Sequence, residues 1–215
     1  MADAVKGTRR YHSPRRAEQA AATRAAVLAA ARDVFVAKGY GAATIAEIAA
    51  RAGTSVDTVY ASVGRKPALL RELVETALSG QDVAVPARQR DYVVQIKAAG
   101  SAAEKLARYA RAVTAIQQRL AAVFLALRDA AVTDPDCARL WAVISERRAS
   151  NMREFAADLR ATGELRDDLT DDQVADVVWS MNAAEYWDLL VGRRGWSPER
   201  FAGWLADSWT RTFLR

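Results

Sequence analysis

The sequence contains few of the side chains that cross-link small proteins or bind metals in them. Its 215 residues include one cysteine, Cys137, and one histidine, His12. A single cysteine cannot form a disulfide within the chain, and one cysteine with one histidine does not make a metal site. We therefore expect no disulfide and no metal, and a reducing, cytoplasmic compartment suits such a chain.

Long apolar stretches are also lacking. The longest purely apolar run, residues 120–127, is far shorter than the roughly 20 residues that a membrane-spanning helix requires. It lies between Arg119 and Arg128, which favours a helix buried inside the protein. Residues 1–16 are charged and contain no apolar core, so no secretory signal is expected there. The sequence predicts no membrane partner.

The alternating pattern of strands rich in Val, Ile and Thr is absent as well. Apolar residues instead recur three and four positions apart in segments rich in Ala, Leu, Arg and Glu, which predicts an all-α fold of about nine helices. Capping residues, glycines and prolines mark their ends. The expected helices cover residues 17–38, 44–52, 55–62, 67–79, 101–132, 134–163, a segment from 170 onward and 197–213, with a connector after residue 80.

Positive charge is unevenly distributed along the chain. Residues 1–80 hold 12 Lys and Arg against 7 Asp and Glu, whereas residues 81–215 hold 19 of each kind. The whole excess of +5 lies in the first third, which indicates a polyanionic partner for that region. The alternative is a solubilising tail, because five of the twelve cations fall within residues 1–16, which we predict to be a disordered basic arm.

Two short capped helices joined by a tight turn predict a helix-turn-helix. The first begins at a capping box formed by Thr44 and Glu47, and the turn contains Gly53. Four apolar residues of the pair are expected to pack on Phe35 of the preceding helix: Ile45, Ile48, Val59 and Val63. We assign residues 17–80, including a linking fourth helix, to this domain and residues 81–215 to a larger helical bundle.

The second helix of the pair, residues 55–62, has little apolar surface to bury. Its short polar side chains suit a DNA major groove, where bulk would keep a helix away from the base edges. Groups that suit phosphate oxygens surround it. The predicted contacts to double-stranded DNA are Thr44, Ser55, Val56, Asp57, Thr58, Tyr60, Ser62, Arg65 and Lys66.

Several of these assignments have an alternative. Asp57 either accepts a hydrogen bond from a cytosine amino group or caps its own helix. Val56 either contacts a thymine methyl group or fills a gap in the packing. Tyr60 either anchors a phosphate or is a core ring with an exposed hydroxyl. Lys66 either anchors a phosphate or is a solvated surface charge. Residues 8–16 either lie in a minor groove or are only disordered.

The segment of about residues 20–73 resembles the TetR family of one-component transcriptional regulators. The matching residues are Ala31, Phe35, Gly39, Thr44, Ile45, Ile48, Ala49, Ala52, Gly53, Ser55, Val59, Tyr60, Lys66, Leu69 and Leu70. Ser62 and Val63 depart from the family pattern, which has aromatic residues or histidine there, and Arg65 replaces a usual Ser or Asn. The lost aromatics should weaken anchoring of the helix, while Arg65 adds a phosphate contact.

The resemblance implies a homodimer that binds a palindromic operator, commonly as a repressor, and is released by a small molecule in the C-terminal domain. The aromatic residues beyond residue 80 form either an ordinary core or a mostly apolar pocket with a few polar groups. The predicted pocket for such an apolar effector consists of Tyr109, Phe124, Arg128, Trp141, Arg148, Met152, Trp179, Asn182 and Tyr186.

Large apolar residues near the C-terminus suggest a surface that a second copy covers. In the family the last two long helices form the four-helix bundle of the dimer, and the pattern here is compatible with that. The predicted interface residues are Trp187, Leu189, Trp204, Leu205, Trp209 and Phe213.

Two other functions are weaker interpretations. The bundle has no histidine, no glycine-rich phosphate loop and no metal cluster, so we expect neither an enzyme nor a cofactor. Cys137 lacks a partner base, and the acid and base pair that Glu185 and Asp188 would provide is more simply a surface feature. A helical protein–protein adaptor that uses the Trp-rich face is the main alternative, but it leaves the charge of residues 1–80 unexplained.

Overall fold

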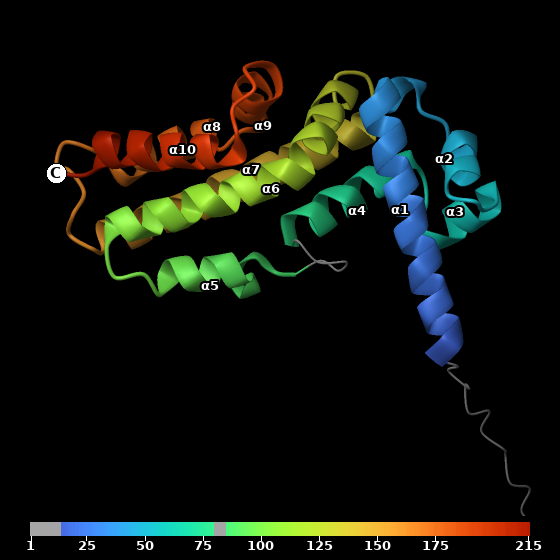
Figure 1. Cartoon of the computed structure of the whole chain (residues 1–215), viewed down its shortest axis with the longest axis horizontal. Coiled ribbons are helices and arrows are strands. Elements are labelled where there is room, and N and C mark those ends of the chain that lie inside the picture. Colours follow the sequence, from blue (N-terminus) through green and yellow to red (C-terminus); the bar gives the residue numbers. More distant parts are fainter. Residues whose placement is uncertain (1–13, 80–84) are drawn as a thin grey trace, which may run out of the picture.

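The computed structural model describes residues 14–79 and 85–215, which fold almost entirely into α-helices (Figure 1). They are α1 (Pro14–Ala42), α2 (Ile45–Arg51), α3 (Val56–Ser62), α4 (Lys66–Ser79), α5 (Asp91–Lys97), α6 (Ala102–Ala130), α7 (Pro135–Arg160), α8 (Asp171–Met181), α9 (Ala184–Trp187) and α10 (Pro198–Phe213). Two short helical segments, η1 (Ala87–Gln89) and η2 (Asp188–Arg193), accompany them. The described residues contain one isolated β-bridge, between Leu165 and Leu214. The prediction of an all-α fold is confirmed.

Helices α1, α2 and α3 share a small apolar core. Phe35 of α1, Ile48 of α2 and Val59 of α3 are buried in one cluster, and Ile45 and Val63 pack against it half-buried, as the sequence predicted. Full burial of such a side chain contributes roughly 1.5–3 kcal/mol. This packing holds α2 and α3 in place, because isolated helices of seven residues do not persist in water.

Local sequence sets the ends of these helices. Gly39 has φ 75° and ψ 166°, a conformation that glycine adopts readily and that interrupts α1 where a stop was predicted. Thr44 and Glu47 form the predicted capping box at the start of α2. Gly53, with φ 65°, makes the turn, and the Ser55 hydroxyl caps α3.

Helix α4 belongs to both parts of the molecule. Its residues Leu69, Leu70 and Val74 are fully buried, and the helix packs against α1 on one side and against α6 and α7 on the other. Glu75 of α4 forms an ion pair of 2.8 Å with Arg147 of α7. A displacement of α7 would therefore act on the short helices through α4.

Two further polar contacts join the same parts. The Tyr40 hydroxyl, near the end of α1, donates a hydrogen bond of 2.8 Å to Asp134, which caps α7. Arg119 Nε of α6 donates to the Ala77 carbonyl of α4 at 3.1 Å. The three-helix unit is thus fixed to the bundle by side-chain contacts as well as by apolar packing.

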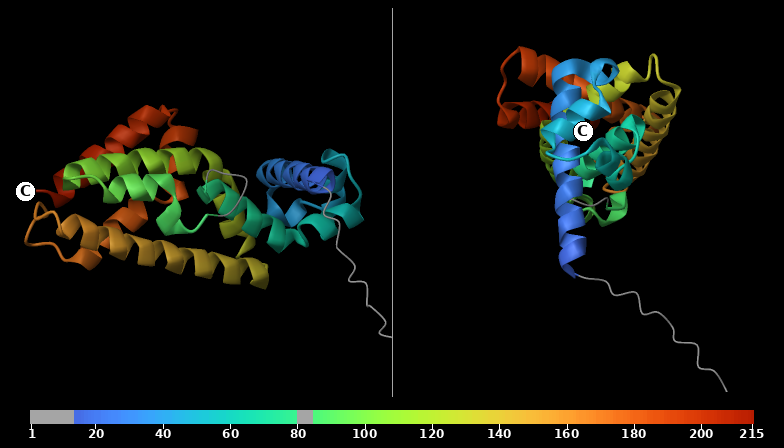
Figure 2. Two further views of the ribbon diagram at one scale, coloured as in Figure 1. Left: turned by 90° about the horizontal axis from the view of Figure 1, so that it is seen from below. Right: turned by 90° about the vertical axis from the view of Figure 1, so that its right-hand side faces the viewer.

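The larger part of the molecule is a bundle built around the 29-residue helix α6. Helix α6 packs against α5, α7, α9 and α10, and α7 packs against α8. Figure 2 shows α6 between α7 and α10, with α5 alongside. The fully buried side chains Leu106, Leu159 and Trp209 mark the centre of this core.

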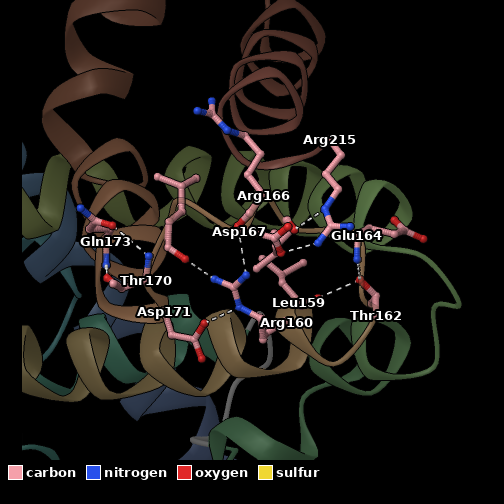
Figure 3. A network of polar contacts seen from close by, with 12 residues as sticks. Leu159, Arg160, Thr162, Glu164, Arg166, Asp167, Thr170, Asp171, Gln173 and Arg215 are labelled. Carbon is pink, nitrogen blue, oxygen red and sulfur yellow. Dashed lines mark hydrogen bonds and ion pairs between the residues drawn. The ribbon is translucent and has the colours of Figure 1, made fainter.

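Polar contacts close the end of the bundle that lies far from α3 (Figures 1 and 3). Arg160 Nε, in the last turn of α7, lies 2.8 Å from the Asp171 carboxylate of α8, and the same guanidinium donates to two backbone carbonyls of the loop between them. The C-terminal Arg215 pairs with Asp167 in the same loop. These contacts tie the C-terminus to the loop between α7 and α8.

The structure differs from the predicted helices at three places. Helix α1 starts at Pro14, so residues 14–16 of the predicted arm are helical, while residues 1–13 lie outside the described residues. The segment after residue 80, predicted as a connector, contains α5. The helix predicted from residue 170 ends at Met181, and α9 and η2 follow it, so the described residues form ten α-helices rather than about nine. Among them, none combines the length and hydropathy needed to cross a membrane.

Candidate functional site

Helix α3 lies beside α2 at the end of the molecule opposite the C-terminus (Figure 1). Only Val59 of its seven residues is buried. Val56 is 36% exposed and Tyr60 is 47% exposed, and Asp57 and Ala61 are exposed as well. Most of the α3 surface therefore serves no internal packing, as the composition of this segment indicated.

The hydroxyl groups of the cap residue Ser55 and of Thr58 and Ser62 in α3 take part in local hydrogen bonds. Ser55 Oγ accepts from the Thr58 backbone N–H at 3.1 Å and lies 2.8 Å from Thr58 Oγ1. Because a hydroxyl has one donor and two acceptor positions, this exposed pair retains capacity for a further partner. Ser62 is half-buried, and its Oγ donates to the Val59 carbonyl at 3.2 Å, so it is directed back onto its own helix.

Asp57 is not the cap of α3, so the capping alternative for this residue is wrong. The acceptor for the first-turn N–H is the Ser55 hydroxyl. Asp57 lies exposed in the first turn, where the helix dipole favours a negative charge. Its contact with a base amino group stays a prediction.

The start of α2 holds a hydroxyl, a carboxylate and an amine close together. Thr44 Oγ1 accepts from the Glu47 N–H and donates to the Glu47 carboxylate, both at 3.2 Å. Glu47 also pairs with Lys38 of α1, and this hydrogen bond, with that from the Thr44 backbone, holds the pKa of Glu47 below its usual value. A phosphate at Thr44 would therefore lie near Lys38, a cation that sequence reasoning did not select.

Two cations follow α3 directly. Arg65 is exposed, and Lys66 is half-buried with its Nζ 4.3 Å from the centre of the Tyr40 ring, a cation–π contact. Neither belongs to an ion pair among the described residues. Their charges are therefore not neutralised by a carboxylate, as a phosphate contact requires.

A second feature is a cavity of about 150 Å³ in the bundle. It is lined mainly by α5, α6 and α7, and its walls are largely apolar. Five of the nine residues predicted for a ligand pocket line it, namely Tyr109, Phe124, Arg148, Met152 and Asn182.

Four polar residues of the cavity, Tyr109, Gln117, Arg148 and Asn182, form one hydrogen-bonded network. Asn182 Nδ2 donates to the Tyr109 hydroxyl at 2.8 Å, and Gln117 Nε2 donates to the Asn182 carbonyl at 2.6 Å. Arg148 donates to the Asn182 side-chain oxygen and, at 3.1 Å, to the Trp179 carbonyl. Burial lowers the pKa of Arg148 and raises that of Tyr109.

The other four predicted pocket residues do not line the cavity. Arg128 is paired with Asp129 and with Glu185 on the bundle surface. Trp141 packs beside Phe124 with ring centres 4.6 Å apart, which places it behind a cavity residue. Trp179 and Tyr186 are partly buried elsewhere. The Arg148 guanidinium lies over the Trp179 ring, and Tyr186 packs against the Trp204 ring. Helical spacing identified the aromatic residues but not the direction that each faces.

Sequence reasoning also missed one wall of the cavity. Arg90, Tyr92, Val93, Ile96 and Lys97 line it from α5 and the residue before it. The signal was present, because Tyr92, Val93 and Ile96 have the spacing of an apolar helix face. The segment of only seven residues offered too little periodicity to separate a helix from a connector.

The predicted dimer interface needs correction. Leu205, Trp209 and Phe213 are fully buried in the core of the single chain, because their face of α10 packs on α6. Trp187 packs edge-on against Phe201, and Trp204 against Tyr186, which leaves both only partly exposed. Of the six predicted residues, only Leu189 is exposed, at 51%.

Comparison with known proteins agrees with this architecture. Residues 27–73, which include α2, α3 and half of α4, match the family described as bacterial regulatory proteins, tetR family. The helix-turn-helix part of the chain is therefore similar to that family. No protein of curated function matches the sequence of the chain significantly.

Solved structures share the TetR-family fold over most of the chain. A TetR-family regulator from Rhodococcus sp. is 18% identical, with 90% of this chain and 99% of that chain covered and a TM-score of 0.67. NalD from Pseudomonas aeruginosa, the secondary repressor of a multidrug efflux pump, is 17% identical, with 92% and 98% covered and a TM-score of 0.69. FadR from Bacillus subtilis, solved with stearoyl-CoA, is 17% identical, with 86% and 96% covered and a TM-score of 0.69.

Proposed function

We propose that this protein is a ligand-responsive transcriptional repressor of the TetR family that binds a palindromic operator as a homodimer. The observation that carries the proposal is the exposure of α3, which buries only Val59 and presents small side chains at one end of the molecule. A helix of this kind can approach base edges in a major groove. Arg65 and Lys66, directly after it, supply charge for the phosphates.

The dimer follows from the geometry of DNA. One α3 contacts too few base pairs for a specific site, whereas two copies read half-sites about 34–36 Å apart, one helical turn, or a multiple of it. In this proposal the dimer interface is formed by the outer face of α10, which carries Gly203 and the charged Asp207 and Arg211. The aromatic face of α10 is buried in the single chain and does not take part.

Ligand control requires that the cavity and α3 be mechanically connected. Helix α7 lines the cavity and holds Glu75 of α4 through Arg147, while α4 packs on α1 of the three-helix unit. A ligand that favours a different position of α7 would move the two α3 helices of a dimer out of their spacing. Operator affinity would change only by the ratio of the ligand's affinities for the two conformers. Repression is the activity named for NalD, and release by a ligand would relieve it.

The adaptor alternative has lost its main support. It required an exposed Trp-rich face, but Trp209 is buried and the other five tryptophans are only partly exposed. An adaptor also leaves α3 and the two cations after it without a role.

The experiment that tests the proposal is a titration of the full chain with random-sequence duplex at two salt concentrations, followed by sequencing of the bound fraction. A repressor of this kind gives an affinity that falls steeply with salt and an enriched inverted repeat. A steep salt dependence without an inverted repeat would reduce the protein to a nonspecific binder. Absence of salt-dependent binding would reject the proposal.

A further inference from the structure

The charges that line the cavity do not balance. Its two acids are already paired, Glu154 with Arg88 at 3.1 Å and Asp158 with Lys105 at 2.9 Å. Arg147 is paired outside the cavity with Glu75 of α4. The remaining lining cations, which include Arg148, have no carboxylate within 4 Å in the described part of the chain.

Arg148 is placed to bind an anion. Its guanidinium lies 5.2 Å from the Trp179 ring centre and 5.6 Å from that of Phe124. One nitrogen, Nη2, donates to the Trp179 carbonyl and to the Asn182 side-chain oxygen. Nε and Nη1 form no hydrogen bond with the described residues. A guanidinium has five donors in a planar fork that matches a carboxylate, so most of its donor capacity remains for a partner.

Gln117 places a second requirement on any ligand of the cavity, in addition to the negative charge that Arg148 favours. The residue is 6% exposed and lines the same cavity, and its Oε1 has no hydrogen-bond partner among the described residues. Exchanging the positions of its amide nitrogen and oxygen would not resolve this, because Nε2 already donates to the Asn182 carbonyl at 2.6 Å. A buried acceptor without a partner is unfavourable, so an occupant should offer a hydroxyl or N–H group there.

The other walls of the cavity and its volume indicate how large and how apolar a bound ligand can be. Val113, Ile116, Leu120 and Ile144 supply apolar surface. A volume of about 150 Å³ matches cavities that accept one benzene ring. An inorganic anion would leave these walls without contacts.

We propose that the cavity binds an apolar carboxylate of about one ring in size, with its carboxylate on Arg148 and a hydroxyl or N–H group facing Gln117 Oε1. The assignment rests on the proposed function, because it names the chemical class of the effector of that same site. A cationic ligand of equal size would be repelled by Arg148, and a neutral one would leave this partly buried charge without a counter-charge, which is unfavourable.

The probes that test this are benzoate, benzamide and benzylamine, which keep the ring and differ in charge. Calorimetric titration of the full chain at pH 7 should give benzoate an affinity about 10- to 100-fold above that of the other two, the range expected for hydrogen bonds to a charged group. At least one of 2-, 3- and 4-hydroxybenzoate should bind more tightly than benzoate.

Matched variants locate the contacts. Arg148→Met should remove the preference for benzoate, and Arg148→Lys, which keeps the charge, should retain part of it. Arg147→Met is the control, because the adjacent cation lines the same cavity but is paired with Glu75. Gln117→Leu should remove only the gain that a hydroxyl provides.

Failure of this inference is distinguishable from failure of the proposed function. Absent benzoate binding, equal binding of the three probes, an unchanged preference in Arg148→Met or an equal loss in Arg147→Met would each overturn the inference. Selective DNA binding would still stand in those cases. Conversely, a benzoate preference in a protein that selects no inverted repeat would uphold the ligand class and reject the repressor.

Discussion

The contact between Tyr40 and Asp134 joins the three-helix unit to the bundle, and its removal should cost measurable stability. One Asp134 oxygen, Oδ2, accepts from the Tyr40 hydroxyl at 2.8 Å. The other, Oδ1, accepts from the backbone N–H groups of Asp136 and Cys137 at 2.9 and 3.1 Å. A single carboxylate thus caps α7 and holds the end of α1.

The magnitude follows from these two roles. A hydrogen bond to a charged group contributes about 1.5–3 kcal/mol, and loss of an Asp cap costs about 0.5–2 kcal/mol. Asp134→Ala should therefore lower the free energy of unfolding by about 2–5 kcal/mol. Tyr40→Phe, which removes only the first contact, should lower it by about 1–2 kcal/mol, since the half-buried carboxylate regains some water.

The assay is urea denaturation of the two single variants and the double variant. In the double-mutant cycle the Tyr40 substitution should have little effect once Asp134 is alanine. The contact also predicts a pH dependence, because hydrogen bonds from Tyr40 and then from the Cys137 backbone lower the pKa of Asp134 in the folded protein. The stabilisation is complete above the ordinary aspartate pKa of about 3.9 and is lost as the pH falls through the lowered folded value. Additive effects of the two substitutions at neutral pH would show that Tyr40 and Asp134 do not stabilise the protein through this contact.

Three other substitutions test separate parts of the account. Gly53→Ala should destabilise the protein by about 1–2 kcal/mol through backbone strain alone, because its φ is 65° and no atom lies within 4 Å of an added Cβ; no change in thermal denaturation would contradict the turn geometry. Trp209→Ala should cost about 3–5 kcal/mol as a core truncation, and an effect seen only in dimer dissociation, measured by sedimentation, would return this residue to an interface. Glu75→Gln should change stability by less than about 1 kcal/mol, because the pair is only partly buried and glutamine can still accept a hydrogen bond from Arg147, yet raise the effector concentration needed to release DNA; unchanged release would exclude the Glu75–Arg147 contact from the coupling.

The sequence predicted the parts of the fold that depend on neighbouring residues. Thr44 with Glu47, Gly39 and Ser55 act through backbone groups within one helical turn, so their roles could be read from short spacings. The packing of Ile48 and Val59 on the cluster of Phe35 follows from helical periodicity in the same way.

What the sequence could not supply is the direction of side chains in the bundle. Trp141 and Phe124 are both aromatic at helical spacing, yet only Phe124 reaches the cavity, because the crossing of α6 and α7 decides which face is inward. The same limit applies to Trp209, whose large apolar ring suits a dimer interface and a monomer core equally well. Burial distinguishes the two, and burial requires the tertiary structure.

If the exposed residues of α3 read bases, a substitution in α3 should change which DNA sequence the protein prefers. Selection from random duplex should be carried out with the wild-type chain, Val56→Thr and Arg65→Ala. We expect Val56→Thr to change the preferred base at the same position in both half-sites, whereas Arg65→Ala should weaken binding on every sequence and leave the preference intact. An unchanged preference in Val56→Thr, or a changed one in Arg65→Ala, would contradict this expectation.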